Sequence, residues 1–349
     1  MSTTKTNSYA AKTAGAPLEP FVIERRAPQA FDVQLEVLHC GVCHSDLHAA
    51  RNDWGMSSFP VVPGHEIVGI VTAVGPSVTR FKVGDSAAVG CLVNSCGDCS
   101  ACARDLEQYC PKPVFTYGAS DPADGTVTYG GYSKHLVTVE KFVLNVPKGL
   151  DLARAAPLLC AGITMYSPLV HWKVKAGTRV GIVGMGGLGH MGIKLAVGMG
   201  ADVTLISRSA SKEKDAKELG AQHFLLSSDA DAMAKAAESL DVILDTIPVK
   251  HDVNPYANLL TLDGSVVIVG QVGPINEVMT QPLIFRRRTI AGSLIGGIAE
   301  TQEMLNFCAE KNILPEVESI RLDQINEAYE RMEKSDVRYR FVIDMSSVE

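Results

Sequence analysis

A glycine-rich turn joins an apolar segment to a helical one near the middle of the chain. Residues 179–184 (RVGIVG) form a continuous apolar run, and a helical pattern extends from the turn to about Gly200. A strand that leads through a tight glycine turn into a helix is the fingerprint of a dinucleotide site, where the helix N-terminus offers free N–H groups to phosphate. The alternative is a glycine turn that serves packing alone. The candidate phosphate-binding residues are Gly184, Gly186, Gly187, Leu188 and Gly189.

Apolar runs continue to alternate with helical segments after this turn. A charged segment around residues 212–219 has helical composition. Fully apolar strands that alternate with helices are typical of a parallel sheet covered by helices on both faces. The sequence therefore predicts a doubly wound α/β domain. Its further strands are expected at DVTLIS (202–207), HFLLS (223–227), DVILDTI (241–247), GSVVIVG (264–270) and TIAGSLI (289–295).

The first 150 residues follow a different pattern. Between Phe21 and about Leu150, short β-type runs are separated by Gly and Pro, for example VQLEVL, EIVGIVTAV, SAAVG and SKHLVTV. This pattern favours an all-β, barrel-like domain with long loops. From about Glu300 the chain returns to helix and then reaches an apolar run, YRFVIDM, which we expect to rejoin this first domain. Two domains also fit a length of 349 residues.

Charge and composition exclude several classes of protein. The net charge is −7 without a long run of one sign, which disfavours a nucleic-acid binder. No apolar stretch approaches the ~18 to 20 residues that span a bilayer, and the first twenty residues lack the apolar region of a signal peptide. We therefore expect no membrane association and a cytoplasmic location. In that reducing compartment, the nine cysteines are expected to be metal ligands or core thiols.

The residues after the second predicted strand of the α/β domain indicate which dinucleotide binds. An NAD site usually places Asp or Glu there, to bond the ribose 2′-hydroxyl. Residues 206–212 (ISRSASK) contain no acid. Instead, Ser207 offers a hydroxyl, and Arg208 and Lys212 offer cations that suit a 2′-phosphate. NADP is therefore preferred, although a solvated helix start with a serine cap fits the same residues.

Four cysteines are closely spaced in a loop that contains Gly and Asp. Their spacing, Cys-x2-Cys-x2-Cys-x7-Cys, places four thiolates within fifteen residues. This favours a structural zinc ion on Cys96, Cys99, Cys102 and Cys110. A bacterial ferredoxin cluster would have its fourth cysteine after three residues rather than seven. A disulfide or free thiols are the remaining alternative.

A second set of metal-ligating residues is dispersed along the chain. Cys43 lies in CGVCHSDLH, His65 and Glu66 lie in PGHEIVG, and Cys160 lies in PLLCAGIT. The His-Glu pair is not part of the HExxH helix of a metalloprotease, because position 69 is glycine and the flanking residues are strand-like. Two thiolates and one imidazole form the ligand set of a catalytic zinc ion with an open position.

Together, these motifs resemble those of the zinc-dependent medium-chain alcohol dehydrogenases, and most closely the cinnamyl-alcohol-dehydrogenase branch with its bacterial NADPH-dependent aldehyde reductases. The shared strings include CGVCHSDLH, PGHEIVG, GGYSKH, PLLCAGITMYSPL, GMGGLGHMGIKLA, AGSLIGG and YRFVID. The resemblance implies a GroES-like β-barrel catalytic domain with a structural zinc lobe over residues 1–154. It further implies a Rossmann-type NADP-binding domain over 155–294 and a C-terminal segment, 295–349, that returns to the catalytic domain.

The resemblance also implies NADP(H) and two zinc ions per chain as cofactors. Cys43, His65 and Cys160 would hold the catalytic zinc ion, with Glu66 adjacent as an outer or transient ligand. Asp46 would orient the zinc-bound histidine. The structural zinc ion would be held by the four closely spaced cysteines, in agreement with their spacing.

Five further residues receive roles from the resemblance. Ser45 and His48 would form a relay that delivers a proton to the reacting oxygen. His44 and Arg340 would lie near the cofactor pyrophosphate. Trp54 would form a wall of the substrate pocket.

The implied activity is that of an oxidoreductase that transfers hydride between NADPH and aromatic or medium aliphatic aldehydes, giving primary alcohols. One alternative is an NAD-dependent polyol or secondary-alcohol dehydrogenase of the same fold, which the missing acid at Ser207 disfavours. Another is a non-catalytic zinc- and nucleotide-binding relative, which the intact ligands and relay disfavour. The resemblance is compatible with a homodimer. Core packing is the role expected for Cys40, Cys91 and Cys308.

Overall fold

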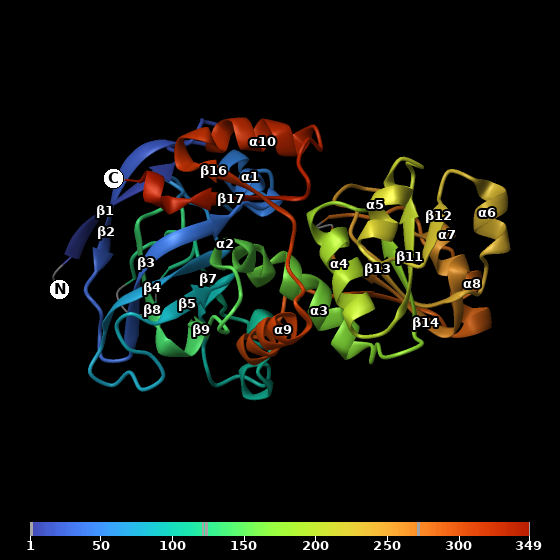
Figure 1. Ribbon diagram of the computed structural model, residues 1–349, viewed down its shortest axis with the longest axis horizontal. Helices are drawn as coiled ribbons and strands as arrows, with labels where there is room; N and C mark the ends of the chain where they lie inside the picture. The colour runs from blue at the N-terminus through green and yellow to red at the C-terminus, as the bar shows by residue number, and fades with distance from the viewer. Residues whose placement is uncertain (1–2, 121, 123–124, 271–272, 349) are drawn as a thin grey trace. The chain divides into compact units, whose positions relative to one another are not determined.

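The computed structural model describes residues 3–120, 122, 125–270 and 273–348. These residues divide into two compact units. The first comprises Met1–Cys160 together with Gly296–Glu349, and the second comprises Ala161–Ile295. Figure 1 shows both units with their labelled helices and strands. The C-terminal segment therefore belongs to the same unit as the N-terminal half of the chain.

The first unit is built around a seven-stranded sheet with the order β16-β17-β3-β4-β5-β9, in which β8 also pairs with β3. All its strand pairs are antiparallel except β16 with β17. Two further two-stranded sheets pair β1 with β2 and β6 with β7. The strands are β1 (Thr3–Ala10), β2 (Glu19–Arg26), β3 (Asp32–Gly41), β4 (Ile67–Val74), β5 (Ser86–Val89), β6 (Leu92–Asn94), β7 (Val114–Phe115), β8 (His135–Val139), β9 (Leu144–Asn145), β16 (Val317–Arg321) and β17 (Arg340–Asp344).

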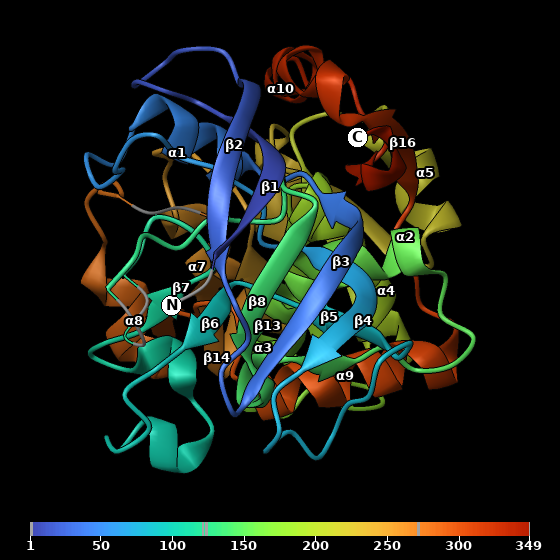
Figure 2. The ribbon, with the colours of Figure 1, turned by 90° about the vertical axis from the view of Figure 1, so that its left-hand side faces the viewer.

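Short helices connect these strands, and two longer ones come from the C-terminal segment. Figure 2 shows β3, β4 and β8 running side by side in this unit. The α-helices are α1 (His44–Arg51), α2 (Leu152–Ala155), α9 (Ile298–Lys311) and α10 (Ile325–Glu333). The 3-10 helices are η1 (Cys102–Arg104), η2 (Glu107–Tyr109), η3 (Glu140–Phe142), η4 (Ala156–Leu159), η5 (Leu322–Gln324) and η6 (Met345–Ser347).

The second unit contains a six-stranded sheet with the order β12-β11-β10-β13-β14-β15, and every pair in it is parallel. This confirms the predicted doubly wound domain. The strands are β10 (Arg179–Val183), β11 (Asp202–Ser207), β12 (His223–Leu226), β13 (Leu240–Asp245), β14 (Leu260–Ile268) and β15 (Thr289–Gly292). The helices are α3 (Ala161–His171), α4 (Gly187–Gly198), α5 (Lys212–Glu218), α6 (Ala230–Lys235), α7 (Asn254–Leu259) and α8 (Thr280–Arg286).

Strand β14 begins four residues before the apolar run that predicted it. Residues 260–263 (LTLD) include polar and exposed positions, and Asp263 has a φ of +65°. The strand pairing is irregular between Leu240 and Val242 on the neighbouring strand. A strand that starts with an irregularity and exposed polar residues lacks the continuous apolar pattern on which the prediction relied.

Each unit has its own hydrophobic core. In the first unit the core combines residues of β3, β4 and β5 with residues of α10 and β17 from the C-terminal segment. In the second unit it combines the parallel strands with α7. Among the residues that the structure describes, no helix has both the length and the apolar character needed to cross a bilayer.

Phe341 provides a test of how firmly the C-terminal segment is built into the first unit. Its side chain is fully buried on β17, with the Arg331 guanidinium 4.8 Å from the ring centroid. We expect Phe341→Ala to lower the free energy of unfolding of this unit by about 3–5 kcal/mol, because it leaves a large cavity. The control is Phe31→Ala, since Phe31 is 62% exposed. Equal effects of the two changes in denaturant titrations would contradict this account.

Candidate active site

Helix α1 carries several of the predicted site residues on one short segment of the first unit. It begins at His44, directly after Cys43, and the Asp46 carboxylate accepts a hydrogen bond from the Cys43 N–H at 2.9 Å. A carboxylate in the first turn is favourable because the first N–H groups of a helix have no partner within it. The helix start therefore fixes Cys43, and Ser45 and His48 follow on the same helix.

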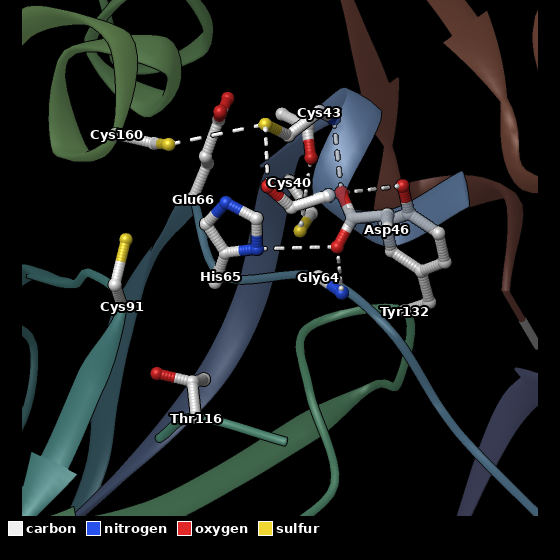
Figure 3. Close-up of polar contacts among 12 residues, drawn as sticks. Cys40, Cys43, Asp46, Gly64, His65, Glu66, Cys91, Thr116, Tyr132 and Cys160 are labelled. Carbon is white, nitrogen blue, oxygen red and sulfur yellow. Dashed lines mark hydrogen bonds and ion pairs between the residues drawn. The ribbon is translucent and has the colours of Figure 1, made fainter. Parts of the chain in front are cut away.

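His65 lies in the turn before β4, and its side chain faces α1. Its Nδ1 is 3.1 Å from Asp46 Oδ1, and Asp46 is fully buried. With Nδ1 held by a carboxylate, Nε2 is the ring nitrogen that remains for a metal. Figure 3 shows this nitrogen on the side of the ring that faces Cys43 and Cys160.

Cys43, His65, Glu66 and Cys160 form one group, the Cys43 cluster. A ligand atom of each residue lies within 4.8 Å of the others, and the two sulfur atoms are 3.9 Å apart. The hydrogen bond with Cys160 lowers the pKa of Cys43 well below its usual range, and the neighbouring His65 acts in the same direction. Two sulfur donors and an imidazole suit zinc, so the residues fit the predicted ion.

Glu66 is fully buried and is paired with Arg340 from β17. Arg340 Nη2 donates to Glu66 Oε1, whereas Glu66 Oε2 and Arg340 Nε have no hydrogen-bond partner among the described residues. Burial raises the pKa of Glu66, and the Arg340 charge opposes that shift. A Cβ at Gly41 would lie 1.8 Å from Glu66 Oε2. The end of β3 therefore has room only for glycine at this position while Glu66 keeps its place. The predicted contact of Arg340 with a pyrophosphate stays a prediction.

His48 is held by an acid that the sequence analysis missed. Its Nδ1 lies 2.7 Å from Asp53 Oδ2, and its ring centroid lies 5.2 Å from that of Trp54. Asn52 ends helix α1 with a φ of +60°, which turns the chain back toward His48. The available signal was the Asn-Asp pair directly after the helical pattern, because Asn favours the left-handed conformation at a helix C-terminus.

Ser45 and His44 lie in different surroundings. Ser45 is half-buried, and its Oγ is 3.7 Å from Cys43 Sγ. His44 is exposed, and its ring centroid is 6.5 Å from that of His48. The structure therefore places a hydroxyl beside the Cys43 cluster, and the roles predicted for His44 and Trp54 stay predictions.

Cys96, Cys99, Cys102 and Cys110 form a second group, the four-cysteine cluster. Their sulfur atoms all lie within 4.8 Å of one another. Three backbone N–H groups donate to these sulfurs, from Cys96 to Cys110 at 3.5 Å, from Cys102 to Cys99 at 3.4 Å and from Lys112 to Cys110 at 3.3 Å. Such bonds stabilise thiolates, and four thiolates suit a closed tetrahedral zinc site.

The three remaining cysteines differ in their surroundings. Cys40 and Cys308 are fully buried, and Cys308 Sγ lies 3.6 Å from the Met304 sulfur. Cys91 is only half-buried, so core packing describes it less well than the other two. Figure 3 shows its side chain near the Cys43 cluster.

The glycine turn of the second unit lies between β10 and α4. Gly184 has a φ of +86°, and a Cβ at Gly189 would lie 2.1 Å from the Gly184 carbonyl oxygen. Gly186 precedes the first turn of α4 and is exposed. The turn therefore requires glycine on steric grounds and presents the helix N-terminus to solvent, as a pyrophosphate site demands.

The residues predicted to select the cofactor follow β11 in the same unit. Ser207 ends the strand, and its Oγ accepts a hydrogen bond from the Ser209 N–H at 3.3 Å. Arg208 is exposed, and Lys212 begins α5. Among the described residues, neither cation forms an ion pair, so both are available to an anionic ligand. Ser211 precedes α5 but forms no side-chain capping hydrogen bond, so the structure does not support the serine-cap interpretation, and the phosphate-binding interpretation stays a prediction.

Comparison with known families identifies two domains in this chain. Residues 29–148 match the model described as the alcohol dehydrogenase GroES-like domain. Residues 187–310 match the model described as zinc-binding dehydrogenase. These matches confirm the fold class predicted for both parts of the chain.

Individual relatives extend the similarity over nearly the whole chain. The NADP-dependent alcohol dehydrogenase C of Mycobacterium tuberculosis is 51% identical over 342 residues, which cover 98% of this chain and 99% of the relative. The structure of a cinnamyl alcohol dehydrogenase, SbCAD4, from Sorghum bicolor has a TM-score of 0.96 at 43% identity and covers 99% of both chains. That of CAD from Helicobacter pylori, complexed with NADP(H), has a TM-score of 0.92 at 39% identity and covers 100% of both chains.

An identity of 51% over 98% of this chain and 99% of the relative shows more than a shared fold. The Cys43 cluster and the glycine turn lie in the two parts of the chain that the two family models describe. The resemblance found in the sequence is thereby confirmed: this chain belongs to the zinc-binding alcohol dehydrogenase family.

Proposed function

We propose that this chain reduces aromatic and medium aliphatic aldehydes to primary alcohols with NADPH, at a zinc ion held in the Cys43 cluster. The observation that carries the proposal is the joint placement of two cysteine sulfurs, an imidazole and a serine hydroxyl in the first unit. Relatives of high identity are named as NADP-dependent alcohol dehydrogenases and cinnamyl alcohol dehydrogenases.

Cys43, His65 and Cys160 are the proposed zinc ligands. A zinc ion bound there supplies a Lewis acid that polarises a carbonyl group. Asp46 keeps the His65 ring in the orientation and tautomer that direct Nε2 toward the two sulfurs. Glu66 is held beside these residues by Arg340 and adds a carboxylate to the outer surroundings of the cluster. The four-cysteine cluster is the proposed second, structural zinc site.

The proton for the alcohol product is proposed to pass along α1. Ser45 and His48 are three residues apart on this helix and therefore lie on the same face. Ser45 Oγ is beside Cys43, and Asp53 fixes His48 through Nδ1, so that Nε2 is the nitrogen that exchanges the proton. Asp53 is thus proposed to set the ring orientation of the relay histidine.

NADPH is proposed to bind at the glycine turn of the second unit. The N–H groups at the start of α4 would receive the pyrophosphate, and Ser207, Arg208 and Lys212 would bind the 2′-phosphate. His44 and Arg340 are proposed as further contacts of the cofactor, and Trp54 as a wall of the substrate pocket. The lack of an acid at the end of β11 favours NADP over NAD.

We further propose that the protein is a cytoplasmic homodimer. Strand β15 is one of the two edge strands of the second unit's sheet, and an unpaired edge favours pairing with another chain. Ile284 and Phe285 on the adjacent helix α8 are 73% and 70% exposed, which is unusual for large apolar side chains of a monomer. None of the nine cysteines forms a disulfide, which agrees with a reducing compartment.

The first test is the initial rate of benzaldehyde reduction with NADPH and with NADH, before and after removal of zinc by a strong chelator. We expect an NADPH-dependent rate that disappears with the metal, because the carbonyl is then no longer polarised. Re-addition of zinc is the control for reversible loss. A preference for NADH would favour the polyol-type dehydrogenase instead. No rate with any aldehyde of a broad panel would favour a non-catalytic binder.

A charge reversal at Arg208 tests the cofactor assignment. We expect Arg208→Asp to raise the KM for NADPH by about 10- to 100-fold, as a lost charge-assisted hydrogen bond would. The KM for NADH should change by less than about threefold, since that cofactor lacks the 2′-phosphate. Lys214→Asp, an equal charge reversal on the exposed side of α5, is the matched control. Parallel losses for both cofactors would refute the role of Arg208.

Substitutions around His48 test the relay. We expect His48→Ala to lower kcat by about 100-fold or less, with zinc content unchanged and partial rescue by added imidazole. Asp53→Asn should lower kcat less and shift its pH dependence, because the ring keeps its place but loses the charged partner. The control is Arg51→Ala. Arg51 lies on the same helix as His48, and its replacement removes only a surface ion pair with Glu333 of α10. An unchanged rate and pH profile in His48→Ala would exclude the relay.

A further inference from the structure

We infer that Tyr132 is a positioning residue for the metal-binding histidine, through a hydrogen bond that fixes the Asp46 carboxylate. This inference rests on the proposed zinc site in the Cys43 cluster and concerns how the chain holds that site. Tyr132 lies in the GGYSKH string, to which the sequence analysis assigned no chemical role. It acts through Asp46.

Tyr132 lies in the segment just before β8, and its side chain contacts Asp46. Tyr132 is fully buried, and its Oη donates to Asp46 Oδ2 at 3.2 Å (Figure 3). Burial raises the pKa of Tyr132 well above its usual range, so the hydroxyl keeps the proton that it donates. The Tyr132 hydroxyl is therefore the donor, and the Asp46 carboxylate is the acceptor. A hydrogen bond to a carboxylate is stronger than one between two neutral groups.

This bond adds to three other contacts of the Asp46 carboxylate. Oδ2 also accepts from the Cys43 N–H at 2.9 Å, whereas Oδ1 accepts from the Gly64 N–H at 3.0 Å and contacts His65 Nδ1 at 3.1 Å. Each carboxylate oxygen thus has two partners. Rotation of the carboxylate would break a bond on both oxygens, so the Tyr132 hydroxyl helps to hold the oxygen that faces His65.

The backbone of the same segment fixes the turn that carries His65. Tyr132 N–H donates to the Pro63 carbonyl at 3.0 Å, and Gly131 N–H donates to the Gly64 carbonyl at 2.8 Å. Gly64 has a φ of +102°, and a Cβ there would lie 2.7 Å from Tyr132 Cδ1. The ring and the turn are therefore packed too closely for a larger residue. Tyr132 consequently constrains both the backbone and the side-chain partner of His65.

Arg25 on β2 anchors this segment from the other side. Its Nη2 donates to the carbonyl oxygens of Tyr129 at 2.8 Å and Gly130 at 3.1 Å, and to Ser133 Oγ at 2.9 Å. The hydroxyl of Tyr132 is thus presented by a segment that is itself tied to the β1–β2 hairpin. A path of hydrogen bonds leads from β2 through residues 129–133 to Asp46 and His65.

The test is Tyr132→Phe, which removes the hydroxyl and keeps the ring. The readout is the rate at which the zinc-loaded protein loses each zinc ion to a chromogenic chelator. The phase that is absent in Cys160→Ser identifies the Cys43 cluster, and the other phase reports the four-cysteine cluster of the same unit. Tyr9→Phe is the matched control, because Tyr9 is a half-buried tyrosine of β1 that packs against the core of the same unit, and its hydroxyl is not among the groups that contact Asp46.

We expect Tyr132→Phe to accelerate zinc loss from the Cys43 cluster by about tenfold, the lower end of the effect of removing an outer partner of a metal ligand. Loss from the four-cysteine cluster and both rates in Tyr9→Phe should stay within about twofold of the wild type. Equal acceleration of both phases would indicate general destabilisation and overturn the inference, as would unchanged rates. A wild-type protein without the first phase would instead overturn the proposed zinc site, and the inference with it.

Discussion

Three segments of the chain converge on the carboxylate of Asp46, which is fully buried at the start of helix α1. A buried carboxylate is costly unless donors surround it, and here each oxygen has two. Because these donors belong to Cys43, to the Gly64–His65 turn and to Tyr132, satisfying one charge fixes the places of two proposed metal ligands. The positions of Cys43 and His65 thus follow from the need of the folded chain to supply hydrogen bonds to the buried Asp46 carboxylate.

The two groups of metal-ligating residues illustrate two ways of using cysteine. The four-cysteine cluster lies within fifteen consecutive residues and accepts backbone N–H bonds on its sulfurs. A closed site of this kind substitutes for a hydrophobic core in a short loop. The Cys43 cluster instead gathers ligands from distant parts of the first unit, where sheet and helix already determine their positions.

Features with a local signature were predicted well from the sequence. Continuous apolar runs gave five strands of the parallel sheet at nearly their observed positions, and the spacing of Cys96 to Cys110 indicated a shared site. The distant ligands Cys43, His65 and Cys160 leave no such signature, and they were assigned through the family resemblance. Asp53 was missed because its contact with His48 depends on a left-handed turn at Asn52.

Long-range contacts account for the other differences between prediction and structure. The pairing of Arg340 with Glu66 joins positions 274 residues apart, and no periodicity reports such a contact. The bond between Tyr132 and Asp46 joins positions 86 residues apart in the same way. The early start of β14 was hidden by exposed polar residues, whose pattern resembles that of a loop. In each case the deciding interaction lies outside the window that a sequence pattern covers.

The pairing of β17 with β3 has a consequence for the order of events during synthesis. The ribosome completes residues 161–295, which form the second unit, before it makes the strand that lies beside β3. Until then, Glu66 lacks the guanidinium that pairs with it, and the last residues of β3, His39 to Gly41, lack one of their neighbouring strands. The nascent first unit therefore spends the translation time of the entire second unit with an open sheet edge. During this interval, the unpaired end of β3 is open to pairing with another chain.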